Sequence, residues 1–228
     1  MERSKPTLDL ERQLLAEGAS LVAGVDAVGR GAWAGPLTVS VVVVDPAREA
    51  PLGVNDSKQL SGKRRAALLE PIEAWAIEFS VGSCSSREVD ALGVSAALRT
   101  SVMRALAALS CKPDALIMDG TVDLLASAAP ELFEQSSHAA VPAKRVSLAK
   151  ADSLCASVAA ASIIAKEHRD SLMRSWDDSF PAFGFASNVG YPSAQHRRAL
   201  AGYGPTAIHR TSWAFLDEVP WLKDAYRQ

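Results

Sequence analysis

Residues 22–36 read VAGVDAVGRGAWAGP, and residues 37–44 read LTVSVVVV. Both stretches are rich in β-branched residues, and a glycine-rich turn separates them, which is the pattern of two neighbouring strands. We expect the first strand over Ser20–Asp26 and the second, antiparallel to it, over Leu37–Val44. This pair decides the fold class, because later strands have to join it through helical crossovers.

Further strands and helices alternate along the rest of the chain. Strands are expected at Ala76–Ser83, Asp114–Gly120 and Arg145–Leu148. Helices are expected at residues 8–18, Ser61–Ala76 with a break or bend near Pro71, from Ser86, and at Ser95–Leu109, Asp152–Ser175 and Ser193–Ala201. Thr121–Val141 has no clear pattern beyond a helical turn around Leu124.

This order of elements predicts an α/β fold, in which helices flank a mixed five-stranded sheet. The length of 228 residues fits one domain over 1–228, with a core at about 20–175 and a small helical C-terminal part at about 176–228.

Bulk composition excludes several protein classes. An apolar fraction of 48% and a charged fraction of 22% are ordinary for globular chains and argue against disordered and fibrous proteins. The net charge of -2 argues against a strongly basic tail, although a local basic patch would suffice to bind phosphates. The first residues, MERSKPTLDLERQLL, lack the apolar core of a signal peptide, and no apolar run approaches the roughly 20 residues of a membrane span. We therefore expect a cytoplasmic protein without a membrane segment.

The three cysteines, Cys84, Cys111 and Cys155, are odd in number and widely spaced. Without a CxxC pair they favour free thiols over disulfides or a zinc site.

Three aspartates occupy similar local positions. Asp26 and Asp119 each end an expected strand, and Asp152 opens an expected helix. Each one alone is equally well explained as a turn former or helix cap. If the strands are neighbours, the three carboxylates converge, and oxygen ligands without His or Cys suit a hard cation such as Mg²⁺ or Mn²⁺. Two such ions about 4 Å apart can drive the attack of water on a phosphodiester.

The residues that follow Asp26 place an arginine between two glycines, Gly29-Arg30-Gly31. Glycines let the backbone N–H groups approach a ligand closely, and Arg30 would then anchor a phosphate or hydroxyl. A bare turn is the simpler interpretation. A dinucleotide loop is disfavoured, because Asp26 precedes the glycines and Pro36 stands where a helix should run.

Six stretches carry a resemblance to a known family. They are VAGVDAVGRGAWAGPL (22–37), VNDSKQLSGKRR (54–65), LIMDG (116–120), KADSLCASVAAASIIAKEHRD (150–170), FPAFGFASNVGYPSAQH (180–196) and LAGYGPTAIHRTSWAF (200–215). In order and spacing they resemble the motifs of bacterial ribonuclease HII, from roughly Val22 to Phe215. The resemblance implies an RNase H-like fold and a monomer that needs Mg²⁺ or Mn²⁺. It also implies cleavage of RNA within RNA/DNA hybrids or at single ribonucleotides embedded in duplex DNA.

The resemblance also implies roles for individual residues. Asp26, Asp119 and Asp152 match three of the family's four metal-binding carboxylates. Gly29, Arg30 and Gly31 match the GRG loop that senses the ribose 2′-hydroxyl, the group that distinguishes RNA from DNA. Tyr191 matches the tyrosine that packs against the sugar following the ribonucleotide. Lys58 is expected near the backbone phosphates.

His168, His196 and His209 are expected to be structural or phosphate-facing, because hard cations rarely take imidazole ligands. The segment 219–228 carries no recognisable clamp-binding motif.

One departure from the family pattern bears on catalysis. The family motif reads DEVGRG, whereas this chain reads DAVGRG, so Ala27 stands at the second carboxylate position. Changes outside the first ligand shell already cost about 10 to 100-fold in metal affinity or activity, and a missing ligand should cost at least as much. We therefore expect impaired or metal-dependent cleavage.

Three explanations of Ala27 stay open: an engineered substitution, a natural homologue in which water, the substrate phosphate or another acid completes the shell, and an inactive homologue that only binds hybrids. Further departures at Pro192, Ser193 and residues 188–189 favour a natural origin slightly. A small-molecule phosphotransferase that uses the same acids would leave Tyr191 and the GRG loop unexplained.

Overall fold

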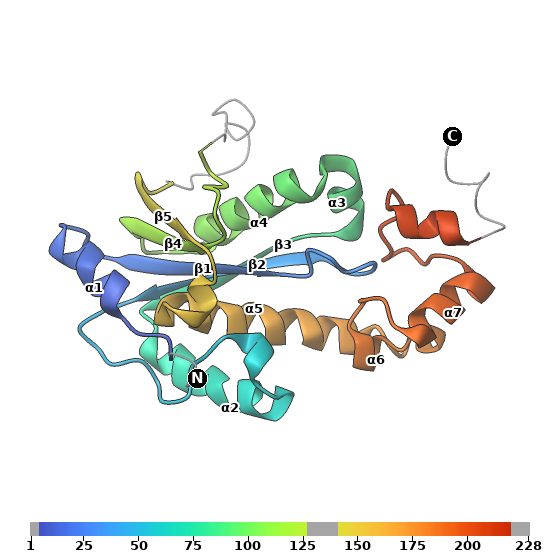
Figure 1. Ribbon diagram of the computed structural model, residues 1–228, viewed down its shortest axis with the longest axis horizontal. Coiled ribbons are helices and arrows are strands. Elements are labelled where there is room, and N and C mark those ends of the chain that lie inside the picture. The colour runs from blue at the N-terminus through green and yellow to red at the C-terminus, as the bar shows by residue number, and fades with distance from the viewer. Residues whose placement is uncertain (1–4, 127–140, 220–228) are drawn as a thin grey trace. The chain divides into compact units, whose positions relative to one another are not determined.

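The computed structural model describes residues 5–126 and 141–219, and it contains the expected mixed five-stranded sheet flanked by helices (Figure 1). The strands are β1 (Val22–Val28), β2 (Leu37–Val44), β3 (Glu78–Cys84), β4 (Ala115–Asp119) and β5 (Lys144–Leu148). The helices of the described chain are α1 (Asp9–Ala16), α2 (Gly62–Trp75), α3 (Ser86–Leu92), α4 (Val94–Ala108), α5 (Ala156–Ser175), α6 (Phe185–Asn188) and α7 (Ala194–Tyr203).

The sheet has the order β3-β2-β1-β4-β5. β1 and β2 form the expected antiparallel pair, whereas β4 pairs parallel with both β1 and β5. The parallel pairs need crossovers, and the chain reaches β4 through α4. This mixture of directions confirms the predicted fold class.

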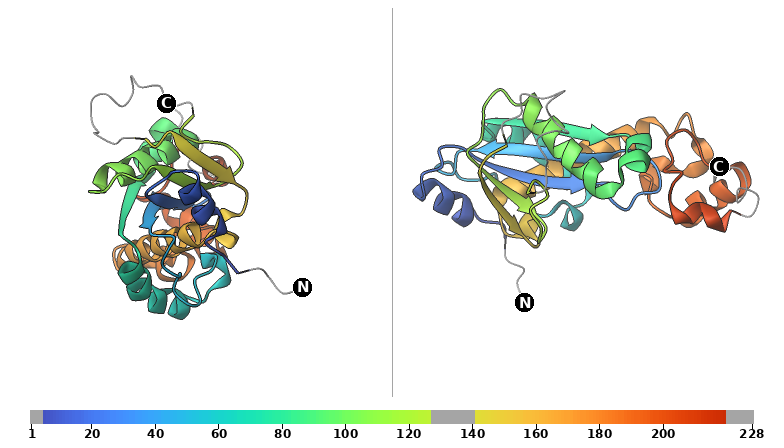
Figure 2. Two further views of the ribbon diagram at one scale, coloured as in Figure 1. Left: turned by 90° about the vertical axis from the view of Figure 1, so that its left-hand side faces the viewer. Right: turned by 90° about the horizontal axis from the view of Figure 1, so that it is seen from above.

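The chain folds into two compact units. The first comprises Met1–Val28, Thr38–Ser83 and Leu98–Glu167, and the second comprises Gly29–Leu37, Cys84–Ala97 and His168–Gln228. The first unit holds the sheet almost entirely, with α4 on one face and α5 on the other (Figure 2).

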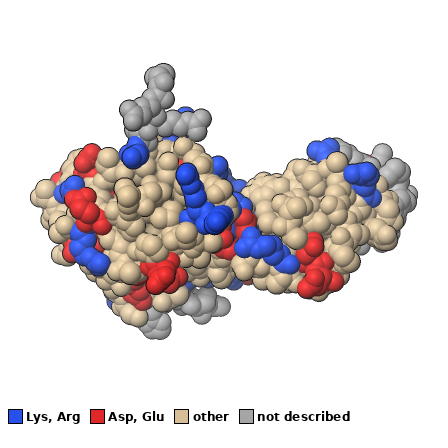
Figure 3. All heavy atoms as spheres, turned by 90° about the horizontal axis from the view of Figure 1, so that it is seen from below, with Lys and Arg blue, Asp and Glu red and all other residues tan. Residues whose placement is uncertain are grey.

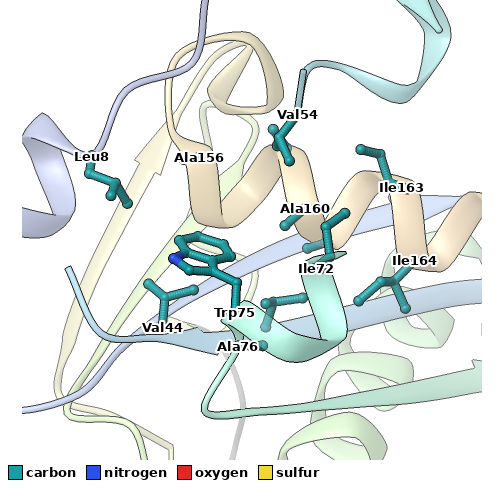
Figure 4. Close-up of a cluster of buried hydrophobic side chains, with 13 residues drawn as sticks. Leu8, Val44, Val54, Ile72, Trp75, Ala76, Ala156, Ala160, Ile163 and Ile164 are labelled. Carbon is teal, nitrogen blue, oxygen red and sulfur yellow. The ribbon is translucent and has the colours of Figure 1, made fainter. Parts of the chain in front are cut away.

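The core of the first unit explains why its strands are so apolar. All eight residues of β2 are buried, because helices cover both faces of the sheet. Ile72 and Trp75 of α2 pack with Ile163 and Ile164 of α5 in one cluster that also reaches the end of β2 (Figure 4). The facing part of α5 is rich in fully buried alanines, whose small side chains let the helix approach the sheet closely.

One such close approach of α5 to the sheet is at Gly24 of β1. A Cβ atom there would lie 2.2 Å from the backbone carbon of Ser157 and 2.4 Å from the nitrogen of Val158. Both partners are main-chain atoms of α5, so no side chain can rotate away to make room. Glycine at this position therefore sets the distance between helix and sheet.

The core of the second unit is aromatic. Phe183 and Phe185 stack with their ring centroids 5.5 Å apart, and Trp33 stacks on Phe215 at 4.4 Å. These pairs lie beside α7, whose first turn Ser193 caps by accepting a hydrogen bond from the N–H of His196.

Several predicted boundaries are wrong. The first strand does not end at Asp26 but runs to Val28, because its pairing with β2 continues as far as Val28↔Thr38. The expected helix Asp152–Ser175 begins only at Ala156, and Asp152 lies in a separate 3-10 turn, Ala151–Ser153, that follows the left-handed backbone of Lys150.

Other predictions hold with small shifts. The helix expected at Ser61–Ala76 is α2, which continues through Pro71, so of the expected break or bend the break is wrong. The strand expected at residues 76–83 starts at Glu78, since Ala76 still caps α2. A turn is present at residues 124–126, but residues 127–140 and 220–228 lie outside the described chain. Cys84, Cys111 and Cys155 form no disulfide within the described residues.

Gly24→Ala tests the contact between β1 and α5. We expect the free energy of unfolding to fall by about 3 kcal/mol, because the new methyl group overlaps main-chain atoms. Urea unfolding followed by circular dichroism would measure the change. Gly62→Ala is the matched control: a Cβ atom at this first residue of α2 would lie an ordinary 3.6 Å from Arg65 Nη2, so it meets no overlap and stability should not fall. Equal stability of the two variants would contradict the close approach.

Candidate active site

The ends of β1 and β4 bring the first two aspartates together. The parallel pairing of these strands reaches Val25↔Met118, so Asp26 and Asp119 follow at the same edge of the sheet. Neighbouring parallel strands place such residues side by side. Asp119 is the last residue of β4, as the sequence predicted.

Asp152 reaches the same edge from the turn that follows β5. The Ala151 N–H donates a hydrogen bond to Asp119 Oδ1 at 2.9 Å, which ties this turn to the end of β4. Asp152 is buried, with its Oδ2 2.9 Å from Lys58 Nζ. The structure therefore gathers all three predicted carboxylates in the first unit.

Burial and neighbouring charges perturb the carboxyl group of Asp26. Burial, which leaves it 8% exposed, is the main cause that raises its pKa to about 7, and the charges of Asp119 and Asp152 add to the shift. The backbone of Ala27 and the ammonium of Lys58 act in the opposite direction. A second positive charge at this edge would further favour the ionised form.

Lys58 lies on a 3-10 turn, Ser57–Gln59, between two carboxylates. Its Nζ is 2.9 Å from Asp152 Oδ2 and 3.8 Å from Asp56 Oδ1. Desolvation lowers the pKa of Lys58, but the hydrogen bond to Asp152 and the surrounding carboxylates outweigh it and raise the pKa overall. The side chain is 69% exposed, so its ammonium is also open to a partner from solvent.

A pocket of about 350 Å³ opens at these residues. Its lining consists of Asp56, Lys58, Gln59, Asp119, Lys150, Asp152 and Ser153. Asp56 is a carboxylate that the sequence analysis missed, although it stands beside Lys58 in the NDSK stretch. It caps the Lys58 turn by accepting a hydrogen bond from the Lys58 N–H at 2.9 Å. Burial is the main cause that raises the pKa of Asp152, and the charge of Asp56 adds to this shift.

The donor chemistry of this pocket suits a hard divalent cation. Every acidic donor is a carboxylate oxygen, the ligand type that Mg²⁺ and Mn²⁺ prefer. In residues 5–126 and 141–219, however, no three His, Cys, Asp or Glu side chains are gathered closely enough to form a metal cage. The carboxylates interact electrostatically, and Lys58 supplies positive charge beside Asp152.

The second unit brings the GRG loop and Tyr191 together. The Gly29 N–H donates a hydrogen bond to Tyr191 Oη at 3.2 Å. Arg30 and Gly31 are exposed, and within the described chain their backbone N–H groups make no hydrogen bond to protein. Two adjacent free amide donors can bind an oxygen of a ligand.

Two buried arginines beneath this loop escaped the sequence analysis. Arg169 and Arg210 are both 0% exposed, and their guanidinium groups donate hydrogen bonds to loop carbonyls. The signal was available, because each follows a histidine in a quoted motif, HRD at 168–170 and HRTSW at 209–213.

His196 and His209 form a buried pair, which fits the expected structural role. The Thr206 N–H donates to His209 Nδ1 at 2.9 Å, which leaves the His209 proton on Nε2 to bridge the 2.9 Å to His196 Nε2. His196 then carries its own proton on Nδ1, 3.0 Å from the carbonyl of Tyr191. Both rings are neutral in this arrangement, which we assigned from the hydrogen-bond network.

Comparison with known proteins shows which family this chain is similar to. The model of the ribonuclease HII family matches residues 23–216. The chain belongs to the ribonuclease HII family. The matched range includes every predicted site residue, from Asp26 to Tyr191.

Individual relatives agree with this assignment. A ribonuclease HII of Streptomyces avermitilis is 46% identical over 221 residues, covering 96% of this chain and 88% of that protein. The crystal structure of ribonuclease H2 from Pyrococcus horikoshii superposes with a TM-score of 0.69 at 29% identity, covering 87% of this chain and 96% of the other. Bst-RNase HIII, solved in complex with Mn²⁺, shares the fold with a TM-score of 0.62 at 22% identity, over 90% of this chain and 70% of its own.

The surface charge of this member of the family is mixed. The face drawn in Figure 3 carries Lys and Arg in small groups interspersed with Asp and Glu. Attraction of a polyanion to this face is therefore local rather than spread over one basic field. Among the described residues, no helix combines the length and the apolar character that crossing a bilayer requires.

The neutral histidine pair predicts a pH dependence of stability. Burial, with a smaller contribution from His196, lowers the pKa of His209 from 6.5 to about 3. A group whose folded pKa is lowered contributes stability above its unfolded pKa and loses it as the pH falls, here from 6.5 towards 3. The variant His209→Gln does not suffer this loss. The difference in the free energy of unfolding between the parent and His209→Gln should therefore shrink by about 2 kcal/mol between about pH 7.5 and pH 5.

Urea unfolding of parent and variant at both pH values would measure this difference, and other titrating groups cancel in the comparison. His168→Gln is the control, because His168 is exposed and lies outside the buried pair. If the difference in the free energy of unfolding between the parent and His209→Gln stayed constant with pH, the buried pair would not be neutral.

Proposed function

We propose that this chain hydrolyses RNA in RNA/DNA hybrids and at single ribonucleotides in duplex DNA, with Mg²⁺ or Mn²⁺ as cofactor. The observation that carries the proposal is the meeting of Asp26, Asp119 and Asp152 at one sheet edge, in a chain of the ribonuclease HII family.

In this proposal the three aspartates hold the metal through their carboxylate oxygens. The bound cation supplies Lewis acidity and a water of lowered pKa. Asp26 is suited to this role, because its buried carboxyl is costly to ionise without a nearby positive charge. The side chain of Lys58 is mostly exposed to solvent beside Asp152, and in this proposal it contacts a backbone phosphate next to the cleaved bond.

Recognition of ribose falls to the second unit. The free N–H groups of Arg30 and Gly31 are donors to which a 2′-hydroxyl oxygen fits, and DNA lacks that group. Tyr191, whose hydroxyl already accepts from Gly29, presents its ring to the adjoining sugar. Together these contacts would make a ribonucleotide bind better than a deoxyribonucleotide.

Ala27 weakens the metal site in this proposal. Its Cβ leaves β1 on the face opposite to that of Asp26, because strand side chains alternate. Pairing between β1 and β4 stops at Val25, so β4 forms no ladder hydrogen bonds with β1 beside residue 27, and in this proposal a longer acidic side chain there bends around β1 towards Asp26. Asp56, already in the pocket, is the acid placed to offset the loss in part.

The remaining parts of the proposal concern context. The partner is nucleic acid, and the protein acts as a monomer in the cytoplasm. Light scattering coupled to size exclusion would test the monomer, and a mass of twice 24.1 kDa would contradict it.

The activity is tested on a DNA duplex that contains one ribonucleotide. We expect incision in Mg²⁺ or Mn²⁺, none in EDTA, and a rate at least about 100-fold lower in Asp152→Asn, because the variant lacks a negatively charged ligand. Asp178→Asn is the control: Asp178 is exposed, so its rate should match the parent. Calorimetry should show weaker Mn²⁺ binding in Asp152→Asn alone. Equal Mn²⁺ affinity and equal rates in both variants would contradict the metal site.

Ala27→Glu tests the missing carboxylate. We expect tighter Mn²⁺ binding and a rise in rate of about 10-fold or more at limiting metal, whereas Ala27→Gln, which has the same shape without the charge, should gain nothing. If the parent prefers the ribonucleotide duplex but cuts it in neither metal, the chain is a binding homologue. No gain from the glutamate would show that this position is not what limits activity.

A further inference from the structure

Arg210 is a buried cation whose hydrogen bonds go to the main chain of one short segment. Its Nη1 donates a hydrogen bond to the carbonyl of Arg30 at 2.9 Å, and its Nη2 donates to the carbonyls of Gly29 and, at 3.3 Å, Gly35. The guanidinium also lies over the Trp213 ring, 4.8 Å from its centroid. Two of its three acceptors therefore belong to the GRG loop itself.

Arg169 holds the other end of the same segment. Its Nε donates to the carbonyl of Pro36 at 2.8 Å and its Nη2 to that of Ala34 at 3.0 Å. Its Nη1 donates to the carbonyl of Val189 at 2.8 Å, two residues before Tyr191, and the guanidinium lies 5.4 Å from the Tyr191 ring centroid. One side chain thus connects the loop with the tyrosine.

Packing leaves this arrangement little freedom. A Cβ atom at Gly29 would lie 2.4 Å from Arg169 Nε and 2.6 Å from the carbonyl oxygen of Pro36. The loop backbone therefore rests directly on the guanidinium group, in a left-handed conformation that glycine adopts without strain.

A contribution to folding stability does not by itself explain why Arg169 and Arg210 are buried together. Both guanidinium groups are fully buried, and neither forms an ion pair with a carboxylate in the described chain. Burial lowers the pKa of each, and repulsion from Arg169 adds to the shift of Arg210 to about 10. Two like charges buried close together oppose folding, so the hydrogen bonds they make have to compensate for that cost.

The geometry of the loop shows what the two arginines achieve. Their six hydrogen bonds occupy five carbonyls of residues 29–36 and that of Val189. With those carbonyls bound from beneath, the N–H groups of Arg30 and Gly31 lie at the exposed tip without a hydrogen-bond partner in the described chain. A planar fork of donors does this, whereas a lysine ammonium cannot span the same acceptors.

We propose that Arg169 and Arg210 are positioning residues for ribose recognition: they fix the GRG loop and Tyr191 in the one arrangement that separates ribonucleotides from deoxyribonucleotides. The inference rests on the proposed function, because it assigns the loop the task of reading ribose. Neither arginine touches the substrate.

Arg210→Lys and Arg169→Lys test this role, since each keeps the charge and loses the fork. Binding is measured by fluorescence anisotropy, with Ca²⁺ in place of Mg²⁺, to a duplex with one ribonucleotide and to the same duplex in DNA alone. We expect the preference for the ribonucleotide duplex to fall by about 10-fold in either variant, with little change in affinity for DNA. Arg198→Lys is the control, because Arg198 is exposed on α7 and should keep the parental preference.

The outcomes separate the inference from the proposed function. A parent without any preference for the ribonucleotide duplex overturns both. A parent with a preference that both lysine variants retain overturns the positioning role alone. A lower melting temperature with an unchanged preference in the folded protein would show a purely structural role and also overturns it.

A second measurement uses the unmodified protein, in case the variants do not fold. In NMR spectra of protein labelled with ¹⁵N-arginine, the Nε resonances of the two buried guanidinium groups should exchange slowly with water. They should shift on addition of the ribonucleotide duplex and stay in place with the all-DNA duplex. Identical spectra with the two duplexes would overturn the inference.

Discussion

The parallel pairing of β1 with β4 is the constraint on which the candidate active site depends. Its register, Val25↔Met118, decides that Asp26 and Asp119 emerge at one edge, although 93 residues separate them in the chain. β5 extends the same parallel arrangement, and the turn after it brings Asp152 to Asp119 through a hydrogen bond from Ala151. Gly24 allows α5 to approach β1 closely. Asp26, two residues further along β1, is buried, and the charges of Asp119, Asp152 and Lys58 act on the pKa of its carboxyl.

The second unit solves a different physical problem, which is to keep an exposed loop in a single conformation. The buried guanidinium groups of Arg169 and Arg210 donate hydrogen bonds to main-chain carbonyls of residues 29–36. In the same unit, the aromatic rings of Phe183 and Phe185 pack around the pair of His196 and His209. A hydrogen-bonded series runs from Thr206 through His209 and His196 to the carbonyl of Tyr191. Polar groups of this kind are costly to bury unless every member has a partner.

Much of the architecture could be predicted from pattern. The β-branched runs of β1 and β2 and the turn between them were sufficient for an antiparallel pair, and the apolar LIMD stretch was sufficient for β4. The wrong boundaries and the missed residues have a common cause: a local sequence pattern does not show which remote segment a residue contacts in the fold. β1 extends past Asp26 since β2 pairs with it there, and Asp152 leaves α5 because Lys150 adopts a left-handed backbone. Asp56 was missed because its place in one pocket with Asp119 and Asp152 depends on segments far away in sequence, and Arg169 and Arg210 were missed because the carbonyls that they bind are equally remote.

By itself the sequence determined the class of fold, the acidic oxygen donors available for a metal, the family resemblance and the alanine at position 27. Those are properties of residue type, order and spacing, which need no third dimension. Tertiary structure alone decided which carboxylates interact, that Lys58 pairs with Asp152, and that two buried arginines hold the loop. The physical reason is that pKa values, ion pairs and hydrogen bonds depend on distance and burial, which only the packing of remote segments sets.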